Sequence, residues 1–145
     1  MKALVQRVTQ ARVIADREVV GEIGPGLCVL LGIARGDEPQ EAVRLAERVA
    51  GLRVFENEDG KFDYSLLEVG GAVLVVSQFT LIADTSKGNR PSFSEAAEPE
   101  VAEPLYEAFC AALAAHGVPV ETGLFGARMR VELANDGPVT IVLDS

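Results

Sequence analysis

The chain has 145 residues, of which 48% are hydrophobic and 24% are charged, and its formal net charge at pH 7 is −9. This composition is typical of a globular protein, and the length fits one domain, residues 1–145, with a real hydrophobic core. The negative charge excludes a protein that coats nucleic acid through its overall charge.

The expected compartment is the cytoplasm. No apolar run reaches the roughly 20 residues that a membrane helix needs, and the N-terminus lacks the apolar stretch of a signal peptide. Cys28 and Cys110 lie in apolar stretches, which predicts free, buried thiols rather than a disulfide. One histidine and two distant cysteines do not form a cluster of metal ligands, so we predict no metal and no cofactor.

The first third of the chain is predicted to form strands and then a helix. Loose alternation of apolar and polar residues over 4–14 indicates a long, half-buried strand. After a turn at 24–26, the apolar run Leu27–Ile33 predicts a central strand that is buried on both faces. Residues 37–51 are expected to form a helix, with Asp37 as its N-cap and Pro39 in its first turn.

The middle of the chain contains one clear strand and one long loop. Arg53–Phe55 is predicted to be a short strand, Ser65–Glu68 to be irregular, and Ala72–Val76 to be a buried strand. Residues 83–94 form a polar segment that ends near an aromatic side chain. Loops of this length without regular structure are usually functional or disordered, and we expect this one to serve function.

The last third is predicted to contain a second helix and two closing strands. The helix ends at Gly117; Pro99 suits its start, but Pro104 would interrupt it, so we expect the regular part to begin near Pro104. Two apolar strands follow, joined by a turn at 135–138. The whole pattern predicts an α+β fold, a curved and mostly antiparallel sheet or open barrel with two main helices packed on one side.

The basic residues of the second half are unevenly placed. Lys87, Arg90, Arg128 and Arg130 bracket the segment 91–127, which has no lysine or arginine and several glutamates. Two interpretations have equal weight at this point. The cations form a local basic surface on an acidic protein, or they are ordinary solvated charges.

A polar motif follows the buried strand at 72–76. It consists of Ser77, Gln78, Phe79 and Thr80. The hydroxyl and amide groups suit a polar ligand, and backbone N–H groups at a strand break can form an oxyanion hole; alternatively, the motif merely ends the strand. The only histidine, His116, is expected at a helix end, so any hydrolysis here lacks an ordinary imidazole base.

The second motif is the turn Asn135-Asp136-Gly137-Pro138-Val139-Thr140. A bond before proline adopts the cis form at a cost of only about 0.5–1 kcal/mol. A cis bond at Gly137–Pro138 would aim two consecutive carbonyl oxygens in the same direction, and such a pair can hold an ammonium group. The alternative is an ordinary turn with a trans bond.

Together these motifs resemble those of the D-aminoacyl-tRNA deacylase family. Residues 77–80 match its SQxT signature, and residues 135–140 match its NxGPxT signature, in the expected order and over the length of the chain. The resemblance implies a hydrolase that cleaves the ester between a D-amino acid, or glycine, and the 3′-terminal adenosine of tRNA. It therefore implies proofreading of mischarged tRNA, with the 3′ end of aminoacyl-tRNA as the partner and no role for a membrane.

The resemblance also implies roles for individual residues. Gly137 and Pro138 should form a cis turn that enters the active site of the partner in a homodimer and rejects L-amino acids by collision, with Arg7 bracing the turn. Residues 77–80 should hold the ester and the terminal ribose, with the backbone N–H groups of Phe79 and Thr80 as oxyanion donors. Phe125 is expected to stack on the terminal adenine, and Met129 to line the same pocket.

Two questions stay open at this stage. Thr80 is either the nucleophile or a bystander to attack assisted by the 2′-hydroxyl of the RNA, and the lack of a nearby base favours the second scheme. The function also has alternatives: a non-catalytic module that binds nucleic-acid ends, or an amidase that acts on free D-amino acid derivatives.

Overall fold

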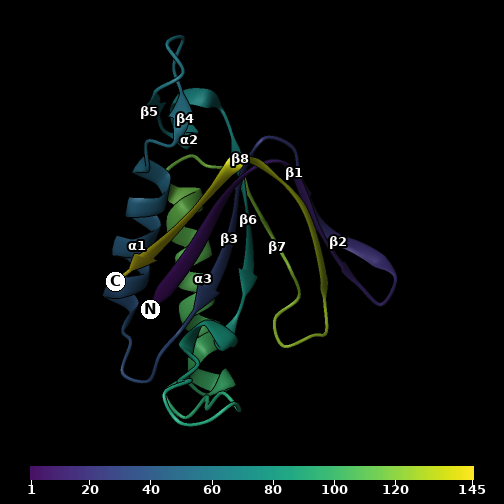
Figure 1. The fold of residues 1–145 in the computed structure, drawn as a ribbon, viewed down its shortest axis with the longest axis vertical. Coiled ribbons are helices and arrows are strands. Elements are labelled where there is room, and N and C mark those ends of the chain that lie inside the picture. The colour runs from purple at the N-terminus through teal and green to yellow at the C-terminus, as the bar shows by residue number, and fades with distance from the viewer.

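A bent six-stranded sheet forms the centre of the molecule in the computed structural model, which describes all residues 1–145 (Figure 1). Its strands are β1 (Lys2–Ala15), β2 (Glu18–Ile23), β3 (Gly26–Gly32), β6 (Ala72–Ser77), β7 (Val120–Thr122) and β8 (Arg130–Asp144). β1 pairs antiparallel with β2, β3 and β8, whereas β3, β6 and β7 run parallel. The α+β prediction is confirmed, and the sheet is mixed and nearly closed into a barrel.

Two main helices cover one face of this sheet. They are α1 (Pro39–Gly51) and α3 (Pro99–Ala115), which lie side by side in Figure 1. The remaining elements are short: β4 (Phe55–Glu56), β5 (Phe62–Tyr64), α2 (Leu66–Val69) and the 3-10 helix η1 (Phe79–Ile82). None of the helices is both long and apolar enough to cross a membrane.

The bent sheet creates two hydrophobic cores. The larger core lies between the sheet and the two helices, where Leu31 of β3 packs with Leu45 of α1 and Phe109 of α3. The smaller core fills the inside of the curl and includes Val13 of β1 and Leu74 of β6. Adjacent side chains of a strand point to opposite faces, so the apolar runs of β3 and β6 serve both cores.

Close approach of β2 to β7 nearly closes the barrel. Gly21 of β2 faces the backbone of Thr122, and a Cβ atom at position 21 would lie 2.3 Å from the Thr122 carbonyl oxygen. Any side chain would therefore hold these two strands apart.

The two closing strands were predicted wrongly as separate elements. They form one strand, β8, and both halves pair with β1 rather than with each other. The register jumps from Gln6 opposite Thr140 to Val8 opposite Asn135, so residues 136–139 bulge out of β8 opposite Arg7. Sequence spacing alone cannot show this, because the partner strand lies more than 120 residues away in the chain.

The α1 boundary also differs from the prediction. Glu38, not Asp37, is the N-cap, and its backbone N–H bonds the Glu41 carboxylate at 2.7 Å in a capping box. The Asp37 carboxylate instead pairs with the N-terminal amino group of Met1 at 2.8 Å and accepts the N–H of Ala34. Asp37 thus ties the start of the chain to the start of α1.

Three further local predictions need correction. The strand expected at Arg53–Phe55 is β4, which lies at Phe55–Glu56. The segment Ser65–Glu68 is not irregular: Ser65 is the N-cap of the short helix α2, and Glu68 completes a capping box with it. The second helix is regular from Pro99 onward, with Pro104 inside it. Pro104 is exposed, and so is Glu100, whose carbonyl loses its helical partner to the proline. Both residues lie on the exposed side of α3, so the lost hydrogen bond is not in the core.

Candidate active site

A cleft of about 590 Å³ opens where β6 ends. Its walls come from four segments of the chain: the end of β6 with η1, the segment before α3, the first turn of α3, and the connection from β7 into β8. The residues that line it include Ser77, Gln78, Phe79, Phe93, Ala97, Ala102, Phe125 and Met129. The structure therefore brings Phe125 and Met129 together with three of the four residues of the SQxT motif.

The SQxT motif ends a rigid strand and starts η1. The Gln78 N–H donates to the Leu31 carbonyl of the neighbouring strand at 2.8 Å, which fixes the break in β6. Phe79 and Thr80 open η1, so their backbone N–H groups have no acceptor within that helix. The Gln78 amide donates to the Thr80 hydroxyl, and no base lies within the motif itself.

Aromatic contacts shape the cleft on two sides. Phe79 is 54% exposed and meets Phe93 edge to face, with ring centroids 5.0 Å apart. Phe125 lies 5.7 Å, centroid to centroid, from the buried ring of Tyr106. The Tyr106 hydroxyl donates to the Val75 carbonyl at 2.7 Å, and burial raises the pKa of this phenol, so it stays protonated.

The NxGPxT turn is the bulge in β8, and its Gly137–Pro138 bond is cis, as expected. The Asn135 side chain spans the bulge, because it accepts the Val139 N–H at 2.7 Å and donates to the Val139 carbonyl at 3.1 Å. Asp136, Gly137 and Pro138 are exposed. The turn thus projects from the sheet, and the hydrogen bonds of the Asn135 side chain hold its two ends together.

Arg7 supports this turn from the opposite strand. Its guanidinium is buried, and Nε donates to the Asp136 carbonyl oxygen at 2.9 Å. Nη1 donates to the Val54 carbonyl at 2.7 Å, and Nη2 lies 3.3 Å from a Glu56 carboxylate oxygen. The Arg7 cation also lies over the Phe62 ring, 5.7 Å from its centroid.

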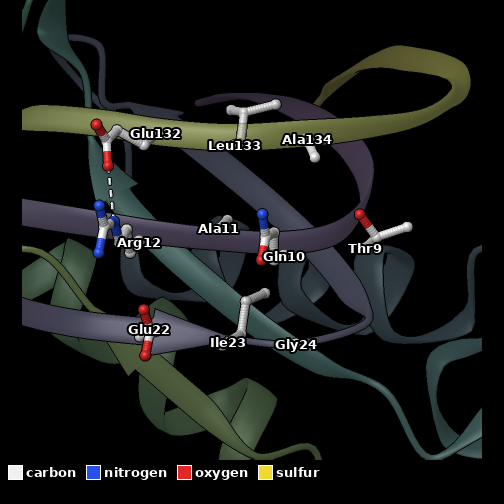
Figure 2. Close-up of a pocket in the computed structure, with 10 residues that line it drawn as sticks. All are labelled: Thr9, Gln10, Ala11, Arg12, Glu22, Ile23, Gly24, Glu132, Leu133 and Ala134. Carbon is white, nitrogen blue, oxygen red and sulfur yellow. Dashed lines mark hydrogen bonds and ion pairs between the residues drawn. The ribbon is translucent and has the colours of Figure 1, made fainter.

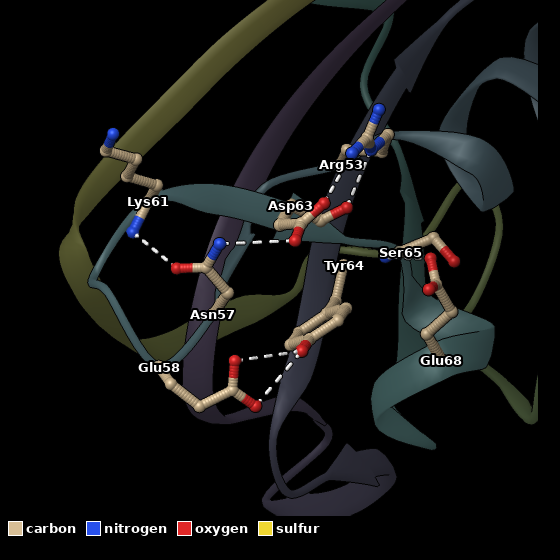
Figure 3. Close-up of polar contacts among 8 residues, drawn as sticks. All are labelled: Arg53, Asn57, Glu58, Lys61, Asp63, Tyr64, Ser65 and Glu68. Atoms are coloured by element: carbon tan, nitrogen blue, oxygen red, sulfur yellow. Dashed lines mark hydrogen bonds and ion pairs between the residues drawn. The ribbon is translucent and has the colours of Figure 1, made fainter.

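The β4–β5 hairpin that supplies these contacts is itself cross-linked by polar groups (Figure 3). Arg53 pairs with Asp63, whose other carboxylate oxygen accepts the Asn57 amide at 3.2 Å. These hydrogen bonds, chiefly that from Arg53, hold the pKa of the Asp63 carboxyl below its usual value. Tyr64 reaches Glu58 at 3.1 Å. The hairpin is therefore a defined support for Arg7.

The two motifs do not meet within one chain. Ser77 pairs with Leu31, which pairs with Ala3, whereas the turn lies opposite Arg7. Ala3 and Arg7 are four residues apart in β1, so the motifs are offset by about 13 Å along the strands. They are also separated across the sheet by the three strand spacings from β6 through β3 and β1 to β8, about 14 Å. In Figure 1 the bend of β8 lies at the upper end of the sheet and the end of β6 at the lower end.

The other ionisable groups of interest lie outside the cleft. His116 is exposed at the far end of α3, about 25 Å from the cleft-lining Pro99 at 1.5 Å per residue. Cys28 is buried, and Cys110 is partly buried. Burial raises the pKa of both thiols to about 11, so neither is a ready nucleophile.

A second groove crosses the opposite half of β1, between β2 and β8 (Figure 2). Arg12 lies at one end of it and pairs with Glu132 of β8 at 2.6 Å. The hydrogen bond from Arg12 is the main reason why the pKa of the Glu132 carboxyl is lowered. None of the predicted site residues lines this groove, so it is not the candidate site.

Some residues of the site were not predicted from the sequence. Ala97 and Ala102 line the cleft, and Val54, Glu56 and Phe62 hold Arg7. Alanines carry no chemical signal, and the hairpin residues are recognised only through their contacts with β1. The aromatic residue that ends the 83–94 loop was a usable signal, because Phe93 does line the cleft.

Comparison with known proteins relates the whole chain to one family. A family profile described as D-Tyr-tRNA(Tyr) deacylase matches residues 4–144. The D-aminoacyl-tRNA deacylase of Roseiflexus sp. is 61% identical over 145 residues, covering 100% of this chain and 94% of the relative. That of Thermus aquaticus is 59% identical over 145 residues, covering 100% and 95%.

Solved structures show the same fold. The c-Myc DNA Unwinding Element Binding Protein superimposes with a TM-score of 0.94 and 44% identity, covering 100% of this chain and 99% of that one. A probable eukaryotic D-amino acid tRNA deacylase has a TM-score of 0.84 over 99% of this chain and 98% of its own. At 19% identity, that second likeness concerns the fold alone.

Proposed function

This chain belongs to the D-aminoacyl-tRNA deacylase family and is a hydrolase with that activity, and from this premise we propose how its two motifs divide the work. The cleft beside the SQxT motif holds the ester between the amino acid and the 3′-terminal adenosine. The Gly137–Pro138 turn of a second copy enters this cleft and rejects L-amino acids. The observation that carries the proposal is the separation of the two motifs within one chain.

A homodimer accounts for that separation. The turn is exposed and held from behind by Arg7, and it reaches no cleft residue of its own chain. A partner copy brings it to the cleft, where its carbonyl groups face the α-amino group of the substrate. An L-side chain then collides with the turn, whereas a D-side chain points away and glycine has none. Rejection by collision requires a rigid wall, and the contacts of Arg7 supply rigidity.

The cleft residues take complementary roles in hydrolysis. The free N–H groups of Phe79 and Thr80 stabilise the oxyanion that forms on the ester carbonyl oxygen. Phe125, fixed against Tyr106, stacks on the terminal adenine, and Met129 lines the same pocket. The Thr80 hydroxyl contacts only Gln78 and has no base beside it, so it is not the nucleophile. Attack on the ester carbon is instead assisted by the 2′-hydroxyl of the terminal ribose.

A direct assay separates this function from the two alternatives. Purified protein is incubated with matched D- and L-aminoacyl-tRNA, and the released amino acid is counted. We expect release from the D-form only. Binding without release would favour a nucleic-acid-end binding module, an alternative supported by the name of the DNA-element binding relative. Equal cleavage of a D-amino acid derivative that lacks RNA would favour the amidase. Ala97→Phe, which fills the cleft, is the control that should abolish release.

A further inference from the structure

We propose that three unpaired cations around the cleft, Lys87, Arg90 and Arg128, form a contact surface for the backbone phosphates of single-stranded RNA. This inference rests on the proposed function, because it assigns the surface that guides the 3′ end of the RNA into the cleft. It gives a role to the long loop 83–94, which the catalytic account leaves without one.

The loop carries two of these cations to the cleft. It is closed at its base by Asp84 and Ser92, whose backbone groups exchange hydrogen bonds of 2.8 and 2.9 Å. Phe93 follows immediately and lines the cleft against Phe79. Residues 85–91 therefore project as a closed loop beside the cleft wall, at the lower end of the view in Figure 1. Lys87 and Arg90 are exposed on this loop.

The third cation lies next to cleft-lining residues in a different segment. Arg128 lies between Ala127 and Met129, both of which line the cleft, and its own side chain is exposed. None of the three cations forms an ion pair. Most other arginines do: Arg7, Arg12, Arg35, Arg53 and Arg130 each pair with a carboxylate. The unpaired cations therefore have their full charge available for a ligand.

Local acidic groups do not cancel this charge. Glu98 is the only acidic residue that lines the cleft, and Arg35 neutralises it at 3.1 Å. At the base of the loop, the Asp84 carboxylate accepts a hydrogen bond from the Ser86 backbone N–H and forms no ion pair with Lys87 or Arg90. A protein with a net charge of −9 repels RNA overall, so a limited unpaired basic rim is the place where a phosphate chain can approach.

The neighbouring aromatic surface identifies single-stranded RNA as the occupant. Proteins that bind single strands combine cations that follow the backbone with aromatic rings on which bases stack. Phe79 is 54% exposed at the same cleft. A duplex would present its bases paired and stacked, and could not use an exposed ring in this way.

The test measures binding of a single-stranded RNA that ends in CCA, as a function of salt. The double variant Lys87→Gln/Arg90→Gln is compared with Arg17→Gln/Arg44→Gln, which removes two exposed and unpaired cations from the β1–β2 turn and from α1. Both variants change the net charge equally. Each lost phosphate contact on a single strand lowers the salt slope of log K by about 0.7. We expect the loop variant to lower it by about 1.4, Arg128→Gln by about 0.7, and the control not at all.

A second measurement separates this inference from the proposed function. At low salt the loop variant should lower kcat/KM for D-aminoacyl-tRNA about tenfold, since each exposed contact contributes up to about fivefold. It should cleave D-aminoacyl-adenosine, which has no phosphate, as well as the unchanged protein does. Equal salt slopes for the loop and control variants would overturn the phosphate surface, even if deacylation is normal. If the salt slopes differ as expected but neither the unchanged protein nor any variant deacylates D-aminoacyl-tRNA, the proposed function alone would be overturned.

Discussion

Arg7 of β1 and Asp136 of the β8 bulge are joined by a 2.9 Å hydrogen bond from the guanidinium to the backbone carbonyl. The two residues lie 129 positions apart in the chain, and the bond connects the centre of the sheet to the exposed turn. Because the same guanidinium contacts Val54, Glu56 and Phe62, the turn is supported by the β4–β5 hairpin as well.

Arg7→Lys should loosen the turn. A lysine keeps the charge but lacks the planar fork that makes three contacts at once. We expect a loss of about 1–3 kcal/mol in the free energy of unfolding, because buried acceptors lose their donor, and a clear rise in hydrolysis of L-aminoacyl-tRNA. Arg12→Lys is the control, since its pair with Glu132 is more exposed and should cost less than about 1 kcal/mol. An Arg7→Lys protein that still rejects L-substrates would contradict this role.

Gly137→Ala should distort the turn directly. Gly137 has a φ of +142°, and an added Cβ would lie 2.7 Å from a Val139 methyl carbon and 3.3 Å from the Arg7 guanidinium. We expect a destabilisation of at least about 1 kcal/mol and a lower ratio of D- to L-hydrolysis. Gly24→Ala is the control: its added Cβ meets free space, so it should change neither the stability nor the ratio of D- to L-hydrolysis. The readouts are denaturant unfolding and paired deacylation assays.

Thr80→Ala should retain measurable turnover. The Thr80 hydroxyl accepts a hydrogen bond only from the Gln78 amide, and no base is positioned to activate it. We expect a modest fall in kcat for D-aminoacyl-tRNA, with the fold intact by circular dichroism. Complete loss of turnover in a folded variant with an unchanged cleft would restore Thr80 as the nucleophile.

The buried thiol of Cys28 should make stability fall at alkaline pH. Burial raises its pKa from 9.0 to about 11, so the folded state holds the proton more tightly than the unfolded state. The contribution is therefore full below pH 9 and is lost as the pH rises through 11, by up to about 2.7 kcal/mol. Cys28→Ala should be less stable at pH 7, because it loses packing, yet should lose less stability between pH 9 and 11. Parallel pH profiles for both proteins would contradict the assignment.

Much of the scaffold follows from local patterns. β1 was predictable because its apolar and polar residues alternate, β3 and β6 because each is a short, continuous apolar run, and α1 because proline and glutamate mark its start. The α2 helix was missed although Ser65 and Glu68 form a capping box, which is a readable signal. Ser77, Gln78 and Phe79, which line the cleft, could be singled out because the SQxT motif is contiguous in sequence.

The rest depends on contacts between distant segments. The bulge of β8 exists only relative to the register of β1, and the support of Arg7 by Glu56 and Phe62 requires the hairpin to fold back over β1. Pro104 was expected to interrupt α3, but it lies inside the helix at an exposed position. Neither register nor solvent exposure can be read from residue types alone.

The central claim is that each cleft receives its selective turn from the other copy. Mixed dimers test it most directly. One protomer carries Ala97→Phe, which blocks its cleft but leaves its turn intact, and is first shown to be inactive alone. The other carries Gly137→Ala, which leaves its cleft open but alters its turn.

Hydrolysis of L-aminoacyl-tRNA is then followed while the cleft-blocked protomer is added in excess. If the turn acts across the dimer, every open cleft acquires an intact turn, so L-hydrolysis should fall to the level of the unchanged protein while D-hydrolysis continues. L-hydrolysis that stays at the level of the Gly137→Ala protein, although size-exclusion chromatography and mass measurement show mixed dimers, would contradict the account.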